Sequence, residues 1–344
     1  MADPSAPERL LIVRLGALGD IVHTIPVAAA LRRGFPSATI DWIVSARHRE
    51  ILDLVPVVDR RLVVGDRGLL AAIGEVRRSR YDVVLDLQGL FKSALLARGT
   101  GAPRVIGFSS GYSREPLARL LYTEAHDPGG GGMYHPNDKS HVVWTNLSVL
   151  QRLGLRVTVP EFPIDNVTSA VADAIARDAG GRYAVLNPGA AWPNKRWPAD
   201  RLSLVAEALW NAHGLRSVVI WGPGEEPLAR EVAAGAPEAV VLAPPTSIRD
   251  LVAILRGAAV LVSGDTGPTH IGSAVGTPIV GIYGPTRASR NGPLSPRDVT
   301  VSREAMCQCH HLRQCRLARM CLLDIDVGEV VDAVERRLAS VSRG

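Results

Sequence analysis

The stretch Leu10–Arg33 reads LLIVRLGALGDIVHTIPVAAALRR. A short apolar run over 10–13 is followed by a turn with two glycines and then by a helix-like segment. A continuous apolar run, in contrast to an alternating one, is typical of a parallel strand that is covered on both faces. The stretch therefore predicts the first strand–turn–helix unit of an α/β domain.

Strand-like runs alternate with helix-like segments along the rest of the chain. Strands are expected at 10–13, 40–44, 61–64, 81–87 and 104–108 in the first half, and at 183–187, 217–221, 239–243, 259–263 and 278–283 in the second. Helices are expected between them, for example over 24–35 and over 198–214, where Gly214 fits a C-cap. The chain has 344 residues, which is long for one domain. We predict an α/β protein of two doubly wound, Rossmann-like domains.

The junction between the domains is expected near VTVPEFPIDNV, residues 157–167, which holds two prolines and little periodicity. We expect an N-terminal domain over 1–162, a C-terminal domain over 163–325 and a helix over 326–344 that packs back on the first domain. The loop over 127–138, with four consecutive glycines, is expected to be a mobile surface loop. Paired α/β domains bind ligands at the carboxyl ends of their strands, in a crevice between the domains.

The composition is that of an ordinary soluble globular protein, with 47% hydrophobic and 21% charged residues. We find neither a signal peptide nor a segment that could span a bilayer. The net charge is +5, and Lys92, Lys139 and Lys195 are the only lysines. Arginine suits phosphate or carboxylate partners, although a GC-rich genome explains an arginine excess equally well.

The four cysteines all lie late in the chain, at Cys307, Cys309, Cys315 and Cys321. This position favours the cytoplasm over a secreted disulfide framework.

Asp20 follows the first glycine turn, where a dinucleotide-binding turn would hold a pyrophosphate. The spacing here is G-x-x-G-D and not G-x-G-x-x-G, and a carboxylate would repel a pyrophosphate. Two roles remain for Asp20: the N-cap of the following helix, or a general base aimed into the ligand crevice. The turn by itself favours the cap.

A second glycine turn, SGDTGPTH over 263–270, is the better phosphate site. It follows a strand, and a helix is expected to begin near Thr269. Glycines let backbone N–H groups converge, and a helix N-terminus adds partial positive charge. Asp265 complicates this reading unless it turns away to cap or orient the loop. His270, in the first helical turn, is by itself more typical of a structural histidine.

Two further strand ends offer charged side chains. LNPGAAWPNKRWP, residues 186–198, presents Lys195, which could balance a diphosphate leaving group or lie solvated on the surface. VVIWGPGEEPLAR, residues 218–230, presents Glu225 and Glu226. A glutamate there could accept both ribose hydroxyls or complement the dipole of the helix that follows.

The cysteines spell C-x-C-x5-C-x5-C, which is neither a paired C-x-x-C knuckle nor a familiar cluster spacing, so we expect free or packed thiols and no metal. The chain has no G-x-S-x-G elbow, no G-x-x-x-x-G-K-[ST] loop and no H-E-x-x-H motif.

These stretches together resemble the bacterial lipopolysaccharide heptosyltransferases, a family of GT-B glycosyltransferases. LIVRLGALGDIVHTIPVAAALR over 11–32 is similar to the N-terminal signature, and SGDTGPTHIGSAVGTPIVGIYGPT over 263–286 is similar to the donor-site signature. NPGAAWPNKRWP lies between them, and the resemblance runs from about residue 10 to about residue 325. YDVVLDLQGLFKSALLAR and SREPLARLLY further resemble the heptosyltransferase I branch.

The resemblance implies a GT-B fold whose two Rossmann-like domains face each other across a cleft. It implies inverting, metal-independent transfer of heptose from ADP-heptose to the Kdo region of lipid A, with no cofactor. Asp20 and Lys195 would be catalytic. The donor residues would be Gly189, Lys195, Glu225, Glu226, Asp265, Thr266, Gly267 and His270. The acceptor residues would be Gly16, Gly19, Arg60, Arg61, Arg114 and His141.

The expected setting is a cytoplasmic monomer at the inner face of the membrane that binds a nucleotide sugar and a lipid A–Kdo acceptor, and no nucleic acid. Three alternatives remain: heptosyltransferase II or another GT-B enzyme with a different nucleotide sugar, an NAD-dependent oxidoreductase, and a metal-stapled binding module.

The sequence departs from the family pattern in a few places. Ala190 and Ala191 stand where hydroxyl residues are expected near phosphate, and SHVVWTNLSVL lacks the expected acid–arginine pair after its histidine. The cysteine-rich tail is closer to the broader family, or to heptosyltransferase II, than to heptosyltransferase I.

Overall fold

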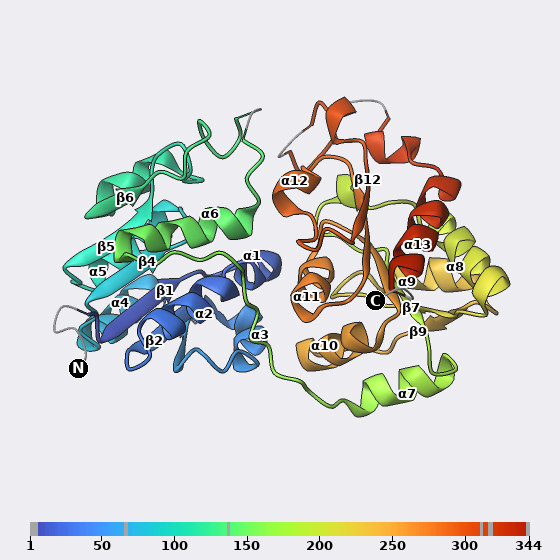
Figure 1. Cartoon of the computed structure of the whole chain (residues 1–344), viewed down its shortest axis with the longest axis horizontal. Coiled ribbons are helices and arrows are strands. Elements are labelled where there is room, and N and C mark those ends of the chain that lie inside the picture. The colour runs from blue at the N-terminus through green and yellow to red at the C-terminus, as the bar shows by residue number, and fades with distance from the viewer. Residues whose placement is uncertain (1–5, 65–67, 136–137, 310–311, 316–318, 342–344) are drawn as a thin grey trace. The chain divides into compact units, whose positions relative to one another are not determined.

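The computed structural model of the chain divides into two compact units, Met1–Asp165 and Asn166–Gly344 (Figure 1). The residues it describes are 6–64, 68–135, 138–309, 312–315 and 319–341. The boundary between the units falls within the stretch 157–167, where the sequence changes character. Each unit is an α/β domain with one parallel sheet.

The first unit is built on six parallel strands in the order β3-β2-β1-β4-β5-β6. The strands are β1 (Arg9–Val13), β2 (Thr39–Ser45), β3 (Arg60–Val64), β4 (Val83–Asp86), β5 (Arg104–Phe108) and β6 (Glu124–His126). The α-helices are α1 (Leu18–Val22), α2 (Ile25–Gly34), α3 (Arg49–Asp53), α4 (Gly68–Arg78), α5 (Phe91–Gly99) and α6 (Val142–Ser148). The 3-10 helices are η1 (Ala46–His48), η2 (Pro116–Leu121) and η3 (Val149–Leu153).

The second unit repeats this topology, with strand order β12-β11-β10-β7-β8-β9. Its strands are β7 (Ala184–Asn187), β8 (Ser217–Val219), β9 (Val240–Leu242), β10 (Val260–Gly264), β11 (Ile279–Tyr283) and β12 (Val299–Ser302). Its α-helices are α7 (Ala170–Asp178), α8 (Ala199–His213), α9 (Glu226–Gly235), α10 (Ile248–Gly257), α11 (Gly267–Val275), α12 (Ala288–Asn291) and α13 (Val327–Val341). Its 3-10 helices are η4 (Pro193–Lys195), η5 (Glu304–Met306) and η6 (Cys321–Asp324).

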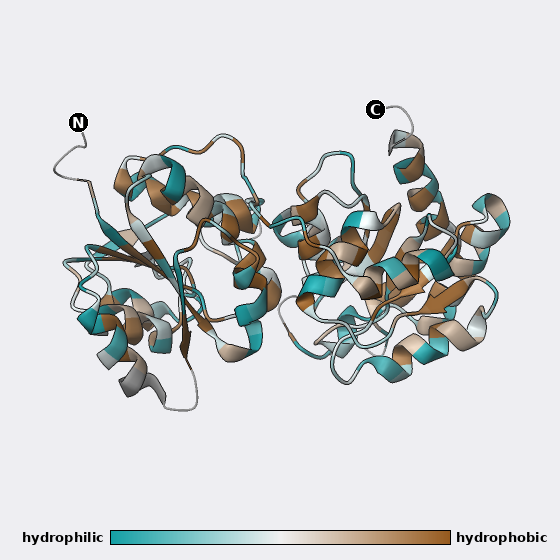
Figure 2. Ribbon diagram, turned by 90° about the horizontal axis from the view of Figure 1, so that it is seen from below, coloured by the Kyte–Doolittle hydropathy of each residue, from teal (hydrophilic) through white to brown (hydrophobic). Residues whose placement is uncertain are grey.

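The apolar runs of the sequence become the centres of the two sheets. Leu10 to Val13 of β1 are fully buried and pair with β2 on one side and β4 on the other. In the second unit, β7 and β10 take the same central place. Hydrophobic residues run through the strands of both units (Figure 2). Burial of these strands on both faces is what a doubly wound sheet requires.

All ten predicted strands are present, and Gly214 is the predicted C-cap of α8, with φ of 59°. The prediction missed two edge strands, β6 and β12. Their sequences, EAH and VTVS, are short and partly polar, so they lack the apolar run by which the others were found. The loop over 127–138 contains no helix or strand among its described residues, and residues 136 and 137 lie outside those.

The C-terminal helix corrects one expectation. We expected it to pack back on the first domain, but α13 packs against α8, β11 and β12 of the second unit. Val330, Val334 and Leu338 lie in the hydrophobic core of that unit. Arg337 also donates to the buried Asp298 carboxylate over 2.8 Å. An apolar stripe with helical spacing needs a complementary surface, and β12, which the sequence analysis missed, supplies part of it.

The packing of α13 predicts that Leu338→Ala destabilises the second unit. Deleting a buried leucine side chain costs about 2–5 kcal/mol of unfolding free energy. The matched control is Leu204→Ala on α8, because Leu204 is half exposed, and such a surface change is expected to stay within about 0.5 kcal/mol. Urea unfolding followed by tryptophan fluorescence measures both. Equal midpoints for the two variants would contradict the packing described here.

Candidate functional site

In the first unit, loops from the carboxyl ends of neighbouring strands meet around Asp20. The Ser45 N–H, at the end of β2, donates to the Leu15 carbonyl in the loop after β1, over 3.1 Å. The Leu15 N–H in turn donates to Oε1 of Gln88, in the loop after β4, over 2.8 Å. The loop after β5 brings in Arg114. The end of β2 and the loops after β4 and β5, all distant in sequence, therefore hold the turn that carries Asp20.

Asp20 lies in the first turn of α1 and is bound by two arginines. Arg14 reaches Oδ1 at 2.8 Å, and Arg114 reaches Oδ2 at 3.2 Å. The Ala17 N–H also donates to Oδ2, over 3.3 Å. Ala17 is the N-cap residue, so the expectation that Asp20 is itself the N-cap is wrong by three positions. The Asp20 carboxylate still helps to cap α1, because it accepts the hydrogen bond from the N–H of the N-cap residue Ala17. The two arginines hold that carboxylate in one orientation.

Arg14 is a buried residue that the sequence analysis did not single out. Its guanidinium donates to the Leu87 carbonyl, and its own carbonyl accepts from Trp42 Nε1 over 3.1 Å. Burial lowers the pKa of Arg14, and the Asp20 carboxylate opposes that shift. A buried cation with an acidic partner is costly to leave unpaired, so Arg14 and Asp20 depend on each other.

Two histidines lie next to α1 and the turn before it, and a third contacts one of them. A Cβ on Gly16 would lie 2.8 Å from Cδ2 of His48, so glycine is needed there for this close approach. Burial and the nearby Arg47 lower the pKa of His48, so it is neutral at pH 7. His23 caps the end of α1 and lies 5.6 Å from His141, ring centre to ring centre. Of the predicted residues, Gly16, Gly19 and Arg114 are thus near Asp20, and His141 contacts the residue that ends α1.

Arg60 and Arg61 are not part of this group, which corrects their predicted place. They begin β3, whereas Asp20 follows the opposite, carboxyl end of the sheet. Arg60 forms an ion pair with the buried Asp41, and Arg61 donates to the carbonyls of Leu52 and Val55. Both arginines therefore stabilise the fold. A strand of five residues separates the two edges by roughly 13 Å, at about 3.3 Å per residue.

In the second unit the predicted turn forms as expected at the end of β10. Asp265 follows the strand, Thr266 is the N-cap residue, and α11 begins at Gly267, so His270 lies in its first turn. A Cβ on Gly264 would lie 3.1 Å from the Lys195 carbonyl oxygen, which places the loop after β7 directly against this turn. The N-terminus of α11, a helix of nine residues, and the loop that carries Lys195 therefore meet at the carboxyl end of β10.

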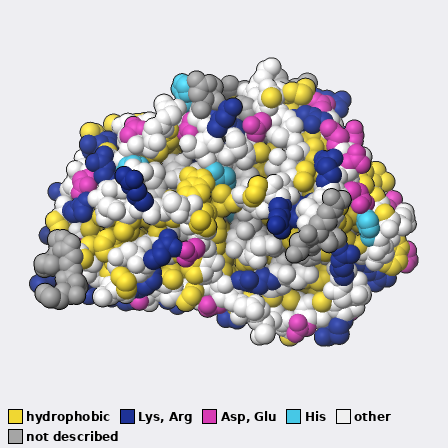
Figure 3. Space-filling model, in the orientation of Figure 1, with side chains coloured by type: hydrophobic (Ala, Val, Ile, Leu, Met, Phe, Trp, Pro, Cys, Tyr) yellow, Lys and Arg dark blue, Asp and Glu magenta, His cyan; other side chains and the backbone are white. Residues whose placement is uncertain are grey.

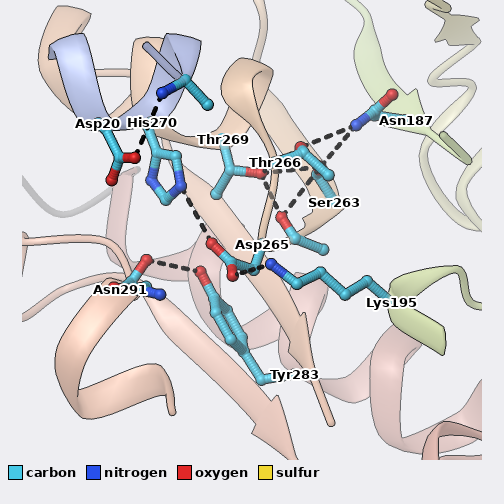
Figure 4. A network of polar contacts seen from close by, with 12 residues as sticks. Asp20, Asn187, Lys195, Ser263, Asp265, Thr266, Thr269, His270, Tyr283 and Asn291 are labelled. Carbon is cyan, nitrogen blue, oxygen red and sulfur yellow. Dashed lines mark hydrogen bonds and ion pairs between the residues drawn. The ribbon is translucent and has the colours of Figure 1, made fainter. Parts of the chain in front are cut away.

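Asp265 is buried between Lys195 and His270 (Figure 4). Lys195 Nζ lies 2.6 Å from Oδ2, and His270 Nε2 lies 3.1 Å from Oδ1. Burial acts to raise the pKa of Asp265, but the hydrogen bond from His270 and the charge of Lys195 outweigh it and hold that pKa well below its usual range. His270 Nε2 therefore donates. The negative charge that seemed out of place in a phosphate site is neutralised within the protein.

Four polar side chains behind this turn fix its shape (Figure 4). Asn187, at the end of β7, donates from Nδ2 to Ser263 Oγ and Thr266 Oγ1, each over 3.0 Å. Thr269 Oγ1 donates to Ser263 Oγ over 2.8 Å. The sequence analysis did not assign Asn187. Its place at the last position of a buried strand, just before Pro188 and Gly189, was the signal that could have found it.

The structure distinguishes Glu225 from Glu226, which the sequence could not. A Cβ on Gly189 would overlap the Glu225 carboxylate, and the Gly222 N–H donates to its Oε2 over 3.0 Å. Glu225 thus lies against the ends of β7 and β8. Glu226 instead pairs with Arg230 on the exposed face of α9, over 2.6 Å. Only Glu225 joins the group formed by Gly189, Lys195, Asp265 and His270.

Comparison with known proteins adds to this geometry. Residues 70–320 match the family model described as glycosyltransferase family 9 (heptosyltransferase). The chain belongs to glycosyltransferase family 9.

Relatives of this glycosyltransferase include lipopolysaccharide heptosyltransferase 1 of Pseudomonas aeruginosa, which is 30% identical over 87% of this chain and 85% of its own. Lipopolysaccharide heptosyltransferase 3 of Escherichia coli is 28% identical over 78% of this chain and 80% of its own. The solved structure of the E. coli heptosyltransferase WaaC with ADP-2-deoxy-2-fluoro heptose has a TM-score of 0.72 and 26% identity, and covers 95% of this chain and 99% of its own. The GT-B fold expected from the sequence is confirmed.

The cysteine segment of this glycosyltransferase lies in the second unit. Cys309 and Cys315 approach to 3.4 Å between their sulfur atoms, and the Cys309 N–H donates to Cys307 Sγ over 3.3 Å. Burial and the neighbouring Cys307 raise the pKa of the Cys321 thiol to about 12. Among the described residues, no group of three or more His, Cys, Asp or Glu side chains could hold a metal ion, and no helix is long and apolar enough to cross a membrane.

The buried ion pair predicts a pH-dependent effect of Asp265→Asn. At pH 7 the variant should lose about 3–5 kcal/mol of unfolding free energy, because Lys195 would be left beside an uncharged amide. The folded pKa of Asp265 is lowered, so its contribution is complete above the unfolded value of about 3.9 and is lost as pH falls below it.

Urea unfolding at several pH values measures this effect. The difference between the wild type and Asp265→Asn should be constant from pH 7 to about pH 5 and should narrow below about pH 4. Asp200→Asn, an exposed position in the first turn of α8, serves as the matched control with an expected loss below about 1 kcal/mol. A difference that widens toward low pH would contradict the ion pair.

Proposed function

We propose that the chain transfers heptose from ADP-heptose to the Kdo region of the lipopolysaccharide inner core, as a heptosyltransferase I. One observation carries the proposal: the first unit presents a carboxylate at its strand ends, whereas the second presents a lysine beside the N-terminus of α11. Glycosyl transfer to a hydroxyl needs a base on one side and a stabiliser of the leaving diphosphate on the other. The similarity to lipopolysaccharide heptosyltransferase 1 enzymes supports heptose as the sugar and lipopolysaccharide as the acceptor.

The donor site lies in the second unit. Lys195 is held by Asp265 yet keeps 15% of its side chain exposed, so its ammonium can meet a diphosphate. The N-terminus of α11 at Gly267 and Thr266 adds partial positive charge. Glu225 would accept hydrogen bonds from the ribose hydroxyls, since carboxylates bind such a pair well. Because these groups supply the positive charge, we propose that the transfer needs no metal.

Asp20 is the proposed general base. The acceptor hydroxyl gives its proton to the Asp20 carboxylate while its oxygen forms a bond to the anomeric carbon. The bond from that carbon to the diphosphate oxygen breaks, and ADP leaves with the bonding electrons from the opposite face, which inverts the configuration. Arg14 and Arg114 orient the carboxylate. Arg114 is the more exposed of the two and would also contact the anionic acceptor, together with His141.

The proposed setting is the inner face of the cytoplasmic membrane, with the protein acting as a peripheral monomer. The acceptor is a lipid whose sugar head group carries carboxylates and phosphates. The similarity to a heptosyltransferase 3 favours addition of a later heptose as the second candidate function.

A transfer assay tests the proposal. Purified protein is incubated with ADP-heptose and Kdo-lipid A, and the product is weighed by mass spectrometry. We expect the mass gain of one heptose, undiminished by a chelator such as EDTA. No gain with this acceptor, or a gain only with an acceptor that already carries heptose, would overturn the assignment. Other nucleotide sugars serve as donor controls.

The proposed base predicts the behaviour of Asp20→Asn. The variant keeps the size of the side chain but removes its basicity, so the turnover number should fall by about two to four orders of magnitude. Asp53→Asn, at an exposed position on α3, is the control and should be near wild type. Transfer by Asp20→Asn at the wild-type rate would return Asp20 to the role of a helix cap.

The proposed ribose contact predicts different effects at two adjacent glutamates. Glu225→Gln should weaken ADP binding about tenfold, because an amide replaces a charged acceptor of two hydrogen bonds. Glu226→Gln should stay within about twofold, since Glu226 faces Arg230 on the surface. Calorimetric titration with ADP measures both. Equal or reversed effects would remove Glu225 from the donor site.

A further inference from the structure

Two neighbouring elements of the first unit, α5 and η2, present large apolar side chains to solvent. Leu117 and Leu120 of η2 are 66% and 76% exposed, and Phe91 and Leu95 of α5 are also exposed. Among the described residues, ten large hydrophobic side chains are exposed, and these two short elements hold four of them. An apolar cluster of this kind marks an interaction surface more often than single exposed residues do.

These four side chains do not serve the core. In η2, Ala118 is buried and Leu121 packs against the core, whereas Leu117 and Leu120 are three residues apart and so share the opposite side of a 3-10 helix. On α5, Ala94 and Ala97 belong to the same core and leave Phe91 and Leu95 outside. The two elements pack together, and the Phe91 N–H donates to the Glu115 carboxylate over 2.6 Å. We call Phe91, Leu95, Leu117 and Leu120 the apolar face.

Basic residues accompany the apolar face. The segments 91–99 and 110–121 carry Lys92, Arg98, Arg114 and Arg119 against a single acidic residue, Glu115. Lys92 and Arg98 are exposed on α5. On the face that Figure 3 shows, hydrophobic and basic side chains also lie side by side over the first unit. Apolar side chains next to lysine and arginine are typical of a surface that binds anionic lipids.

We propose that the apolar face docks on an anionic lipid bilayer. Arg114, which pairs with Asp20, lies two residues before the start of η2, so a bilayer at this face brings a lipid-borne hydroxyl near the base. That consequence rests on the proposed function. A second copy of this chain fits less well. A two-fold contact would place the four basic residues of one copy against the same four of the other, and like charges repel.

Vesicle sedimentation tests the docking. The probes are vesicles of phosphatidylglycerol and phosphatidylethanolamine, compared with vesicles of phosphatidylcholine alone. Wild-type protein should bind the anionic vesicles, and less so at high salt. Leu117→Ser/Leu120→Ser should lower the partition coefficient at least about tenfold. The matched control is Val159→Ser/Leu204→Ser, which removes two exposed apolar side chains elsewhere and should stay within about twofold.

Two further measurements separate the possible failures. The Leu117→Ser/Leu120→Ser variant should transfer heptose to a deacylated, water-soluble acceptor at the wild-type rate. Lost vesicle binding with retained transfer supports the docking, whereas absent transfer in the wild type as well overturns the proposed function and leaves the vesicle result standing. Equal vesicle binding by the variant and the wild type overturns the docking, as does a dimer in ultracentrifugation that the variant converts to monomer. If the variant fails to fold, Lys92→Ser/Arg98→Ser tests the same surface and should lose the preference for anionic vesicles.

Discussion

The ion pair between Lys195 and Asp265 is the interaction on which the second unit's site depends. It joins the loop after β7 to the turn after β10, two strands that are neighbours in the sheet. His270 takes the other carboxylate oxygen, so the buried charge has a partner on each side. A buried carboxylate without such partners would be costly. Because Asp265 is satisfied within the protein, Lys195 is held in place and part of it remains available to an anion.

The first unit uses the same device with the signs exchanged. There the buried group is the cation, Arg14, and the partly exposed group is the carboxylate of Asp20. Both sites follow central strands of sheets with the same strand order, where loops of a doubly wound domain converge. One topology thus presents a carboxylate in one unit and a cation in the other. That division suits a reaction in which one substrate loses a proton and the other substrate releases a diphosphate.

Much of the fold could be predicted from the sequence, because buried parallel strands leave continuous apolar runs. The edge strands β6 and β12 leave no such run and were missed. The site was less predictable, because side-chain partners depend on tertiary contacts. Arg60 faces Asp41 at the amino edge of the sheet, and Glu225 faces Gly189 while Glu226 faces Arg230. The local sequence does not distinguish the structural roles of these residues from site roles. The positions of Asp20 and Asp265 at glycine turns, in contrast, could be predicted from the sequence.

We propose that nucleotide binding belongs to the second unit and proton removal to the first. Calorimetric titration of ADP into Lys195→Ala and into Asp20→Asn tests this division directly. Lys195→Ala should weaken ADP binding at least about tenfold, because a cation next to the diphosphate is lost. Asp20→Asn should bind ADP as tightly as the wild type. Weakened binding in Asp20→Asn together with unchanged binding in Lys195→Ala would contradict it.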